Sequence, residues 1–143
     1  MPPLKFKPPH YEFVLDIALE MTNTDNNQSY WASYNQLRDV CEKHEGTILD
    51  HAFQWETLAD FTSDKSEAIN LYLKALALAK NSEEQDYIAS ISFRLAELYL
   101  DLGQNEKVRI YIDTANDASE QTSDLSLRTE IVDFLLSFNQ NAT

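Results

Sequence analysis

Hydrophobic residues recur every three or four positions along most of this chain. One such stripe comprises Ile88, Ile91, Leu95, Leu98 and Leu102. This spacing places side chains on one face of an α-helix, whereas a strand would show alternation every second residue. The pattern predicts about seven amphipathic helices, over residues 11–22, 29–45, 48–62, 64–81, 82–102, 105–121 and 124–139.

Polar and glycine residues mark the ends of several of these helices. A capping residue is followed three positions later by an acidic or amide residue in three places: Thr47 with Asp50, Asp64 with Glu67, and Ser82 with Gln85. This spacing is typical of helix N-termini. Gly46 and Gly103 each follow a helical stripe, and glycine is the residue that most readily adopts the left-handed conformation that ends a helix.

Proline and glycine are almost absent from the body of the chain. All four prolines lie within the first nine residues, and the 143 residues include two glycines. Sheet proteins need many turn residues, so this distribution favours an all-α fold. The expected organisation is a flexible Pro-rich N-terminus over residues 1–9 and a single helical domain over residues 10–143.

The order of large, small and turn residues between Leu95 and Ala115 is more specific. Leu95-Ala96 is followed by Tyr99, by Gly103 at a turn, and then by three further apolar residues at helical spacing: Val108, Ile112 and Ala115. This stretch resembles the tetratricopeptide repeat, a pair of antiparallel helices. A second copy is Leu58-Ala59 followed by Ala68, Tyr72 and Ala75, with a shorter turn that lacks the glycine.

The resemblance implies a right-handed stack of about three helical hairpins. Residues 48–81 and 84–121 would form two repeats, and residues 11–45 would form a degenerate hairpin. Residues 124–139 would form a terminal helix that covers the last pair, because a stack of repeats needs closed ends. Some other helical bundle is the alternative, since alanine-rich hairpins can imitate the motif.

In proteins with this repeat, the first helix of each pair lines a concave groove. The positions mapped onto that groove are two aromatic residues, four carboxylates, one serine and one leucine: Phe53, Glu56, Asp60, Ser90, Phe93, Glu97, Leu100 and Asp101. Glu56 and Asp60 lie four residues apart, as do Glu97 and Asp101. Carboxylates beside aromatic rings suit a basic peptide or protein, through charge-assisted hydrogen bonds and cation–π contacts.

The overall charge of −13 is consistent with such a partner. Residues 1–10 carry +2, residues 11–81 carry −7 and residues 82–143 carry −8, so the acidity is not confined to a tail. An anionic surface repels nucleic acid and anionic membranes and attracts cationic proteins. The alternative explanation is that the charge serves solubility alone.

Evidence for catalysis is weak in the sequence. Cys41, His44 and His51 lie close enough along the chain to suggest a Cys/His enzyme or a metal site, but a further metal ligand is not evident. No Gly-rich phosphate loop is present. The single cysteine suits a reducing compartment, and residues 1–9 do not resemble a signal peptide, so a cytoplasmic protein without cofactor or metal is expected.

The favoured hypothesis is therefore a non-catalytic protein-binding module with an acidic concave surface. One version is an immunity or antitoxin protein that neutralises a basic toxin such as a nuclease. A regulatory adaptor or co-chaperone that binds a peptide is the alternative, and a small Cys/His enzyme is a second. The oligomeric state and the partner's identity are left open by the sequence.

Overall fold

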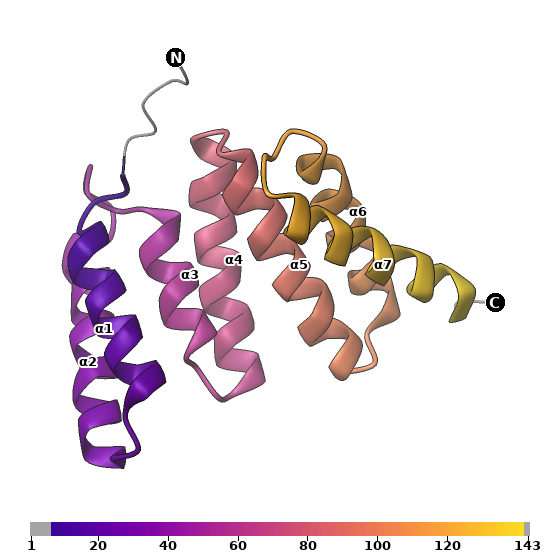
Figure 1. Ribbon diagram of the computed structural model, residues 1–143. Helices are drawn as coiled ribbons and strands as arrows, with labels where there is room; N and C mark the ends of the chain where they lie inside the picture. Colours follow the sequence, from indigo (N-terminus) through magenta and orange to yellow (C-terminus); the bar gives the residue numbers. More distant parts are fainter. Residues whose placement is uncertain (1–6, 142–143) are drawn as a thin grey trace.

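The computed structural model describes residues 7–141, and these form seven helices and no strand (Figure 1). The predicted all-α fold of about seven helices is confirmed. The helices are α1 (Tyr11–Asn23), α2 (Asn27–His44), α3 (Ala52–Asp60), α4 (Lys65–Asn81), α5 (Gln85–Asp101), α6 (Asn105–Ser119) and α7 (Leu125–Asn141). The N-terminal segment predicted to be flexible falls largely on residues 1–6, which lie outside the described residues.

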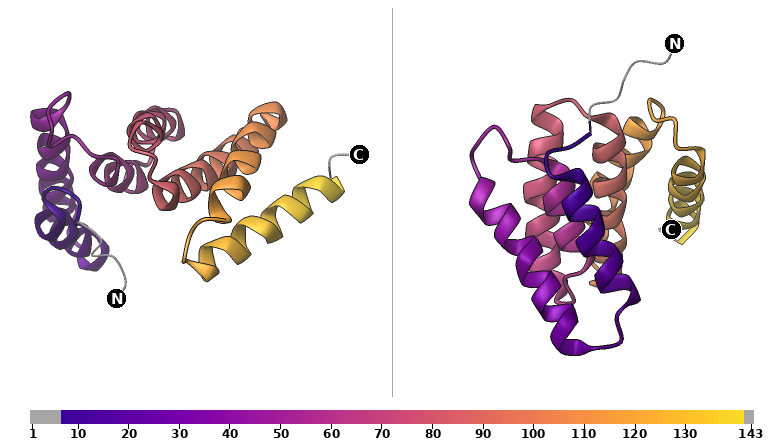
Figure 2. Two further views of the ribbon diagram at one scale, coloured as in Figure 1. Left: turned by 90° about the horizontal axis from the view of Figure 1, so that it is seen from above. Right: turned by 60° about the vertical axis from the view of Figure 1, so that its left-hand side comes forward.

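Each helix packs against the next along the chain, and the helices form two layers. In addition to the contacts between successive helices, α1 contacts α3, and α3 contacts α5. Seen from above, the chain follows an arc with α1 and α2 at one end and α7 at the other (Figure 2, left). The helices α1, α3 and α5 thus share one side of the molecule, which we call the inner face, while α2, α4 and α6 form the outer layer.

The small and large residues of the two predicted hairpins form part of the core. Ala59 on α3 and Ala68 on α4 are buried, as are Ala96 on α5 and Val108 on α6, and the two helices of each pair pack against each other. Small side chains allow the paired helices to approach closely, and Tyr72 and Tyr99, which are also buried, fill the adjoining spaces. The motif residues of both stretches are therefore core residues.

The start of the third helix was predicted wrongly. We expected it to run from residue 48 with Thr47 as its cap, but α3 begins at Ala52, and the His51 side chain accepts the hydrogen bond from the Phe53 backbone N–H at 3.0 Å. The Thr47 hydroxyl instead donates to the His44 carbonyl at 2.7 Å and closes a turn after α2. Ile48, expected on the buried stripe, is 97% exposed.

The start of the fifth helix also differs from the prediction, because Ser82 closes the preceding helix and does not open the next one. Ser82 is the C-terminal cap of α4, its hydroxyl donates to the Leu78 carbonyl at 2.9 Å, and Glu84 is the residue before α5. Other end signals are confirmed. The Asp64 carboxylate accepts from the Glu67 backbone N–H at 2.9 Å. Gly46 and Gly103 have φ angles of +78° and +71°, the left-handed conformation expected after a helix.

The terminal helix α7 packs on α6 and reaches back to α5. Ile131 of α7 is fully buried, and the Phe134 ring meets the Phe93 ring edge-on with centroids 5.7 Å apart. Figure 1 shows α7 lying obliquely across this end of the molecule. Among the described residues, every helix is too short or too polar to span a bilayer.

Candidate functional site

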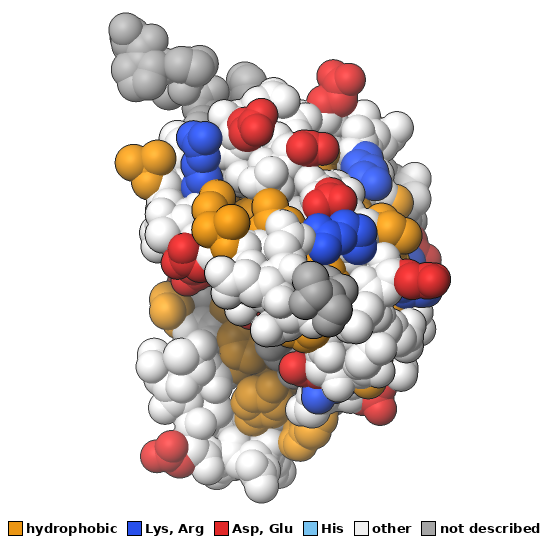
Figure 3. Space-filling model, turned by 90° about the vertical axis from the view of Figure 1, so that its right-hand side faces the viewer, with side chains coloured by type: hydrophobic (Ala, Val, Ile, Leu, Met, Phe, Trp, Pro, Cys, Tyr) orange, Lys and Arg blue, Asp and Glu red, His pale blue; other side chains and the backbone are white. Residues whose placement is uncertain are grey.

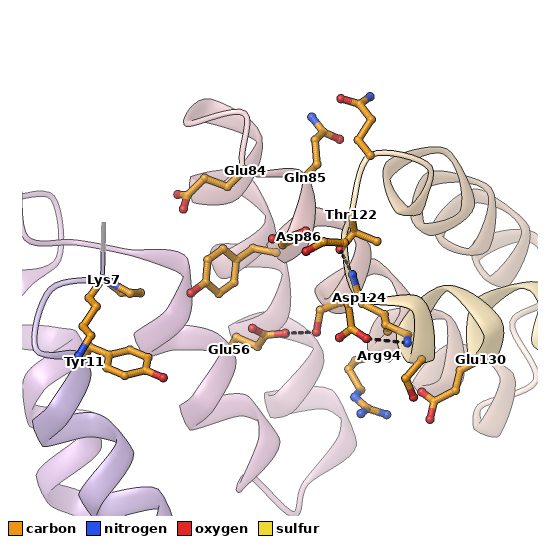
Figure 4. A pocket seen from close by; sticks show the side chains of 17 residues that line it. Lys7, Tyr11, Glu56, Glu84, Gln85, Asp86, Arg94, Thr122, Asp124 and Glu130 are labelled. Atoms are coloured by element: carbon orange, nitrogen blue, oxygen red, sulfur yellow. Dashed lines mark hydrogen bonds between the residues drawn. The ribbon is translucent and has the colours of Figure 1, made fainter. Parts of the chain in front are cut away.

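A hollow of about 1240 Å³ opens on the inner face. Its walls come from the start of α1, from α3, from residues 84–94 at and after the start of α5, and from the α6–α7 connection with the first two turns of α7. Figure 4 shows Lys7 and Tyr11 on one side of this hollow and Asp124 and Glu130 on the other, with Glu56 between them. We refer to this space as the main hollow.

Negative charge is concentrated on the helices of the inner face. The helices α1, α3 and α5 carry eight carboxylates against one arginine, a net charge of −7. The helices α2, α4 and α6 carry six carboxylates against seven lysine and arginine side chains, a net charge of +1. Within these six helices, the fold therefore separates the negative charge of the inner face from a nearly neutral outer layer.

Glu56 lies at the floor of the main hollow and is 8% exposed. The Ser90 hydroxyl, on α5, donates a hydrogen bond of 2.6 Å to its Oε2 atom (Figure 4). Burial raises the pKa of Glu56 to about 7, and the neighbouring Asp60 adds to the rise, while Ser90 and Arg94 oppose it. The side chain therefore changes its charge close to neutral pH.

Asp60 lies one turn further along α3 and lines a second hollow of about 280 Å³. Its carboxylate accepts a hydrogen bond from the Tyr72 hydroxyl. Burial raises the pKa of Asp60, against the lowering effects of Tyr72 and Arg94. A buried carboxylate, Glu56, and a more exposed one, Asp60, thus lie in succession on one face of α3.

Glu97 and Asp101 line the same second hollow from α5, and each has a cation of its own. Arg94 donates to Glu97 at 2.8 Å, and the Lys65 ammonium lies 3.7 Å from the Asp101 carboxylate. All these groups are substantially exposed, so these pairs hold the side chains only weakly. The predicted carboxylates Glu56, Asp60, Glu97 and Asp101 therefore do share one side of the molecule.

Aromatic rings line the α1 side of the site. The Phe53 ring stacks on the Tyr11 ring with centroids 5.2 Å apart and meets the Tyr87 ring at 6.5 Å. Burial, followed by the negative charges of Glu56 and Glu84, raises the pKa of the Tyr87 hydroxyl. Sequence reasoning identified Phe53 and missed Tyr11, Tyr87 and Arg94. Tyr87 lies three residues before Ser90 on the same helix, and this spacing could have indicated that Tyr87 shares the face of Ser90.

Two of the predicted residues lie apart from the others. Phe93 is buried beneath α7, where its ring contacts Phe134, so it is not available as an anchor for a partner. The prediction placed Phe93 in an open groove, but the terminal helix covers it. Leu100 is partly exposed in a separate apolar groove of about 210 Å³, with Phe134 and Phe138. Figure 3, viewed from the end where α7 lies, shows a recess with apolar side chains at its floor.

The Cys41 environment is unlike that of a reactive thiol. Cys41 is completely buried, and burial together with the charges of Asp50 and Glu42 raises its pKa to about 12. A catalytic cysteine needs the opposite change, because the thiolate is the nucleophile. His44 stacks on His10 at 4.4 Å, and His51 contacts Glu84. Among the described residues, no cluster of three or more possible metal ligands occurs.

Comparison with known proteins finds no match, whether to family models, to curated sequences or to solved structures. The resemblance to the tetratricopeptide repeat therefore stays a prediction from the motif residues.

Proposed function

We propose that this protein is a non-catalytic interaction module, built as a stack of tetratricopeptide-like hairpins, that binds a basic protein or peptide on its inner face. The observation that carries this proposal is the difference in charge between the layers, −7 on α1, α3 and α5 against +1 on α2, α4 and α6. If the negative charge served solubility alone, it would have no reason to be concentrated on one layer of helices.

The charge asymmetry is costly for the isolated fold, which supports a role in binding. Carboxylates four residues apart on a helix, such as Glu56 and Asp60, repel each other by about 0.2–0.5 kcal/mol when exposed, and burial increases the cost. A cationic partner relieves this repulsion. A predominantly negative concave surface also attracts a cationic partner from a distance of about a Debye length, 10 Å at 0.1 M salt, and accelerates association.

In one form of this function, the protein is an immunity or antitoxin protein that neutralises a basic toxin such as a nuclease. Such a protein needs steering charge and a surface that covers the toxin, but it needs no catalytic group. A cytoplasmic location would suit this form and agrees with the single buried cysteine. The recruitment of a basic peptide by an adaptor would use the same surface.

The proposal is tested by reversing charge on the two layers separately. Hexalysine serves as the probe, and its binding is followed by calorimetry across a series of salt concentrations. The inner variant combines Glu97→Lys and Asp101→Lys. The outer variant combines Asp113→Lys and Asp117→Lys on α6. It is a matched control because these two carboxylates are also exposed and four residues apart. One of them, Asp113, also has a weak ion pair on its own helix, with Arg109 at 3.7 Å.

We expect the inner variant to bind hexalysine about tenfold more weakly at low salt and with a flatter dependence on salt. The outer variant should retain most of the affinity. Equal losses in the two variants would show that the peptide senses only net charge and would contradict an inner binding face. Purification of the native complex at low ionic strength, followed by elution with salt, should release a basic protein in stoichiometric amount.

A further inference from the structure

Glu56 is a buried carboxylate that lacks a cationic partner within the described part of the chain. Over residues 7–141, no lysine, arginine or histidine nitrogen lies within 4.0 Å of its oxygens. Ser90 is the hydrogen-bond donor to Oε2. A buried ionised carboxylate is costly without a paired cation, so proteins normally place an arginine or lysine beside it or keep it protonated.

The two cationic side chains that line the main hollow, Lys7 and Arg94, are engaged elsewhere. Arg94 contributes a favourable charge interaction to Glu56, but its guanidinium donates to Glu97. Lys7, at the rim of the main hollow, pairs with Glu12 at 2.7 Å. The position beside Glu56 that a counter-ion would normally occupy is therefore not taken by either of these side chains.

The surroundings of Glu56 suit the charged end of a long cationic side chain. Glu56 faces a hollow large enough for a side chain, and Tyr11 and Tyr87 line that hollow on its α1 and α5 sides. Aromatic faces attract cations, by about 0.5–2 kcal/mol depending on desolvation, and they also cover the methylene stem of lysine or arginine. The Ser90 hydroxyl holds the carboxylate in one orientation.

We infer that the Glu56–Ser90 pair, together with Tyr11 and Tyr87, forms an anchor pocket that receives one lysine or arginine side chain of the basic partner. The inference rests on the proposed function and specifies which part of the inner face makes the central contact. The exposed carboxylates Glu97 and Asp101 attract the partner, and Glu56 forms the desolvated ion pair with it.

Such an anchor makes binding dependent on pH near neutrality. The groups that face Glu56 are Asp60 on its own helix, Tyr72 on α4, and Ser90, Tyr87 and Arg94 on α5. With a pKa of about 7, Glu56 is about one-tenth ionised at pH 6 and about nine-tenths ionised at pH 8. The lysines of a ligand stay charged over this range. Raising the pH should therefore strengthen binding, because the cation binds the ionised carboxylate and the proton is released to solvent.

The test measures the affinity for hexalysine between pH 6 and pH 8 at constant low salt, with folding checked by circular dichroism. The wild-type protein should bind about tenfold more tightly at pH 8 than at pH 6. Glu56→Gln should bind at pH 8 about as weakly as the wild type does at pH 6, and its affinity should hardly change with pH. Glu42→Gln, at an exposed position on α2, is the matched control and should behave like the wild type.

Ser90→Ala provides a second, independent readout. Loss of the hydroxyl removes a hydrogen bond that favours the ionised carboxylate, so the midpoint of the pH dependence should move upward. A residue that only supports the fold would lower the affinity at every pH without moving the midpoint.

The anchor and the inner binding face can fail separately. If Glu56→Gln keeps the affinity and pH dependence of the wild type while the Glu97→Lys, Asp101→Lys variant binds weakly, the anchor is wrong and the inner face stands. If the wild-type protein does not bind hexalysine at pH 8 and low salt, both are wrong.

Discussion

Replacement of the buried Glu56 by glutamine should stabilise the protein at high pH and have little effect at low pH. The pKa of Glu56 is raised from 4.5 to about 7 in the folded protein. Below pH 4.5 the carboxyl is neutral in both the folded and the unfolded states, so it adds no dependence on pH. As the pH rises through 4.5 and towards 7, the unfolded chain ionises first, and the folded state loses stability relative to it.

The size of this loss follows from the difference between the two pKa values. A difference of about 2.5 corresponds to about 3 kcal/mol above pH 7, to order of magnitude, because each pKa unit is equivalent to about 1.4 kcal/mol. Glutamine has nearly the same shape and no charge, so Glu56→Gln should recover most of this free energy at pH 8. Its amide can still form a hydrogen bond with Ser90.

Urea unfolding of both proteins between pH 4 and pH 8 measures the effect. The difference in free energy of unfolding between variant and wild type cancels the titration of the other carboxylates, except for the coupling of Glu56 to Asp60. The difference should be close to its minimum at pH 4 and grow to about 2–3 kcal/mol at pH 8. A difference that stays constant across this range would refute the reasoning, because it would mean that Glu56 ionises normally. A stabilised variant that binds weakly would also be typical of a functional site.

Three further predictions concern the scaffold. Glu83, in the α4–α5 turn, has a φ of +55°, a conformation that strains residues with a side chain. Glu83→Gly should therefore raise the free energy of unfolding, measured in urea, by about 1 kcal/mol, and a loss of stability would contradict this backbone strain. Ala96 is fully buried in α5, which packs closely on α6, so Ala96→Leu should lower thermal stability by about 1–3 kcal/mol, whereas an unchanged midpoint would mean that the helices have room to separate. Cys41 should react with Ellman's reagent only as the protein unfolds; rapid labelling of the native protein would contradict its burial and raised pKa.

Part of the candidate site could be predicted because helical geometry is local. Glu56 and Asp60, and likewise Ser90, Glu97 and Asp101, had to share a helical face given their spacing along the chain. The contact between Glu56 and Ser90 was not predicted, because it depends on the packing of α3 beside α5. Phe93 was assigned to the same open face, and this was wrong because a helix more than thirty residues later, α7, covers it.

Other features needed the tertiary structure. The positions of Tyr11 and Tyr87 relative to Glu56 depend on how α1 and α5 pack around α3. The periodic pattern of either helix alone does not reveal this packing. The environments of the individual carboxylates also needed the structure. Glu97 is substantially exposed and has a cation of its own, whereas Glu56 is buried and has none. Burial of Glu56 depends on neighbours that are distant in sequence.

The sequence by itself determined the all-α class, the approximate positions of the helices and the left-handed turns at Gly46 and Gly103. These depend on hydrophobic period and on backbone preferences that act over a few residues. Only the tertiary structure decided where the charge gathers, which face stays open and which carboxylate loses its water. Each of these is a property of distances between helices, and those distances are set by the packing of the whole core.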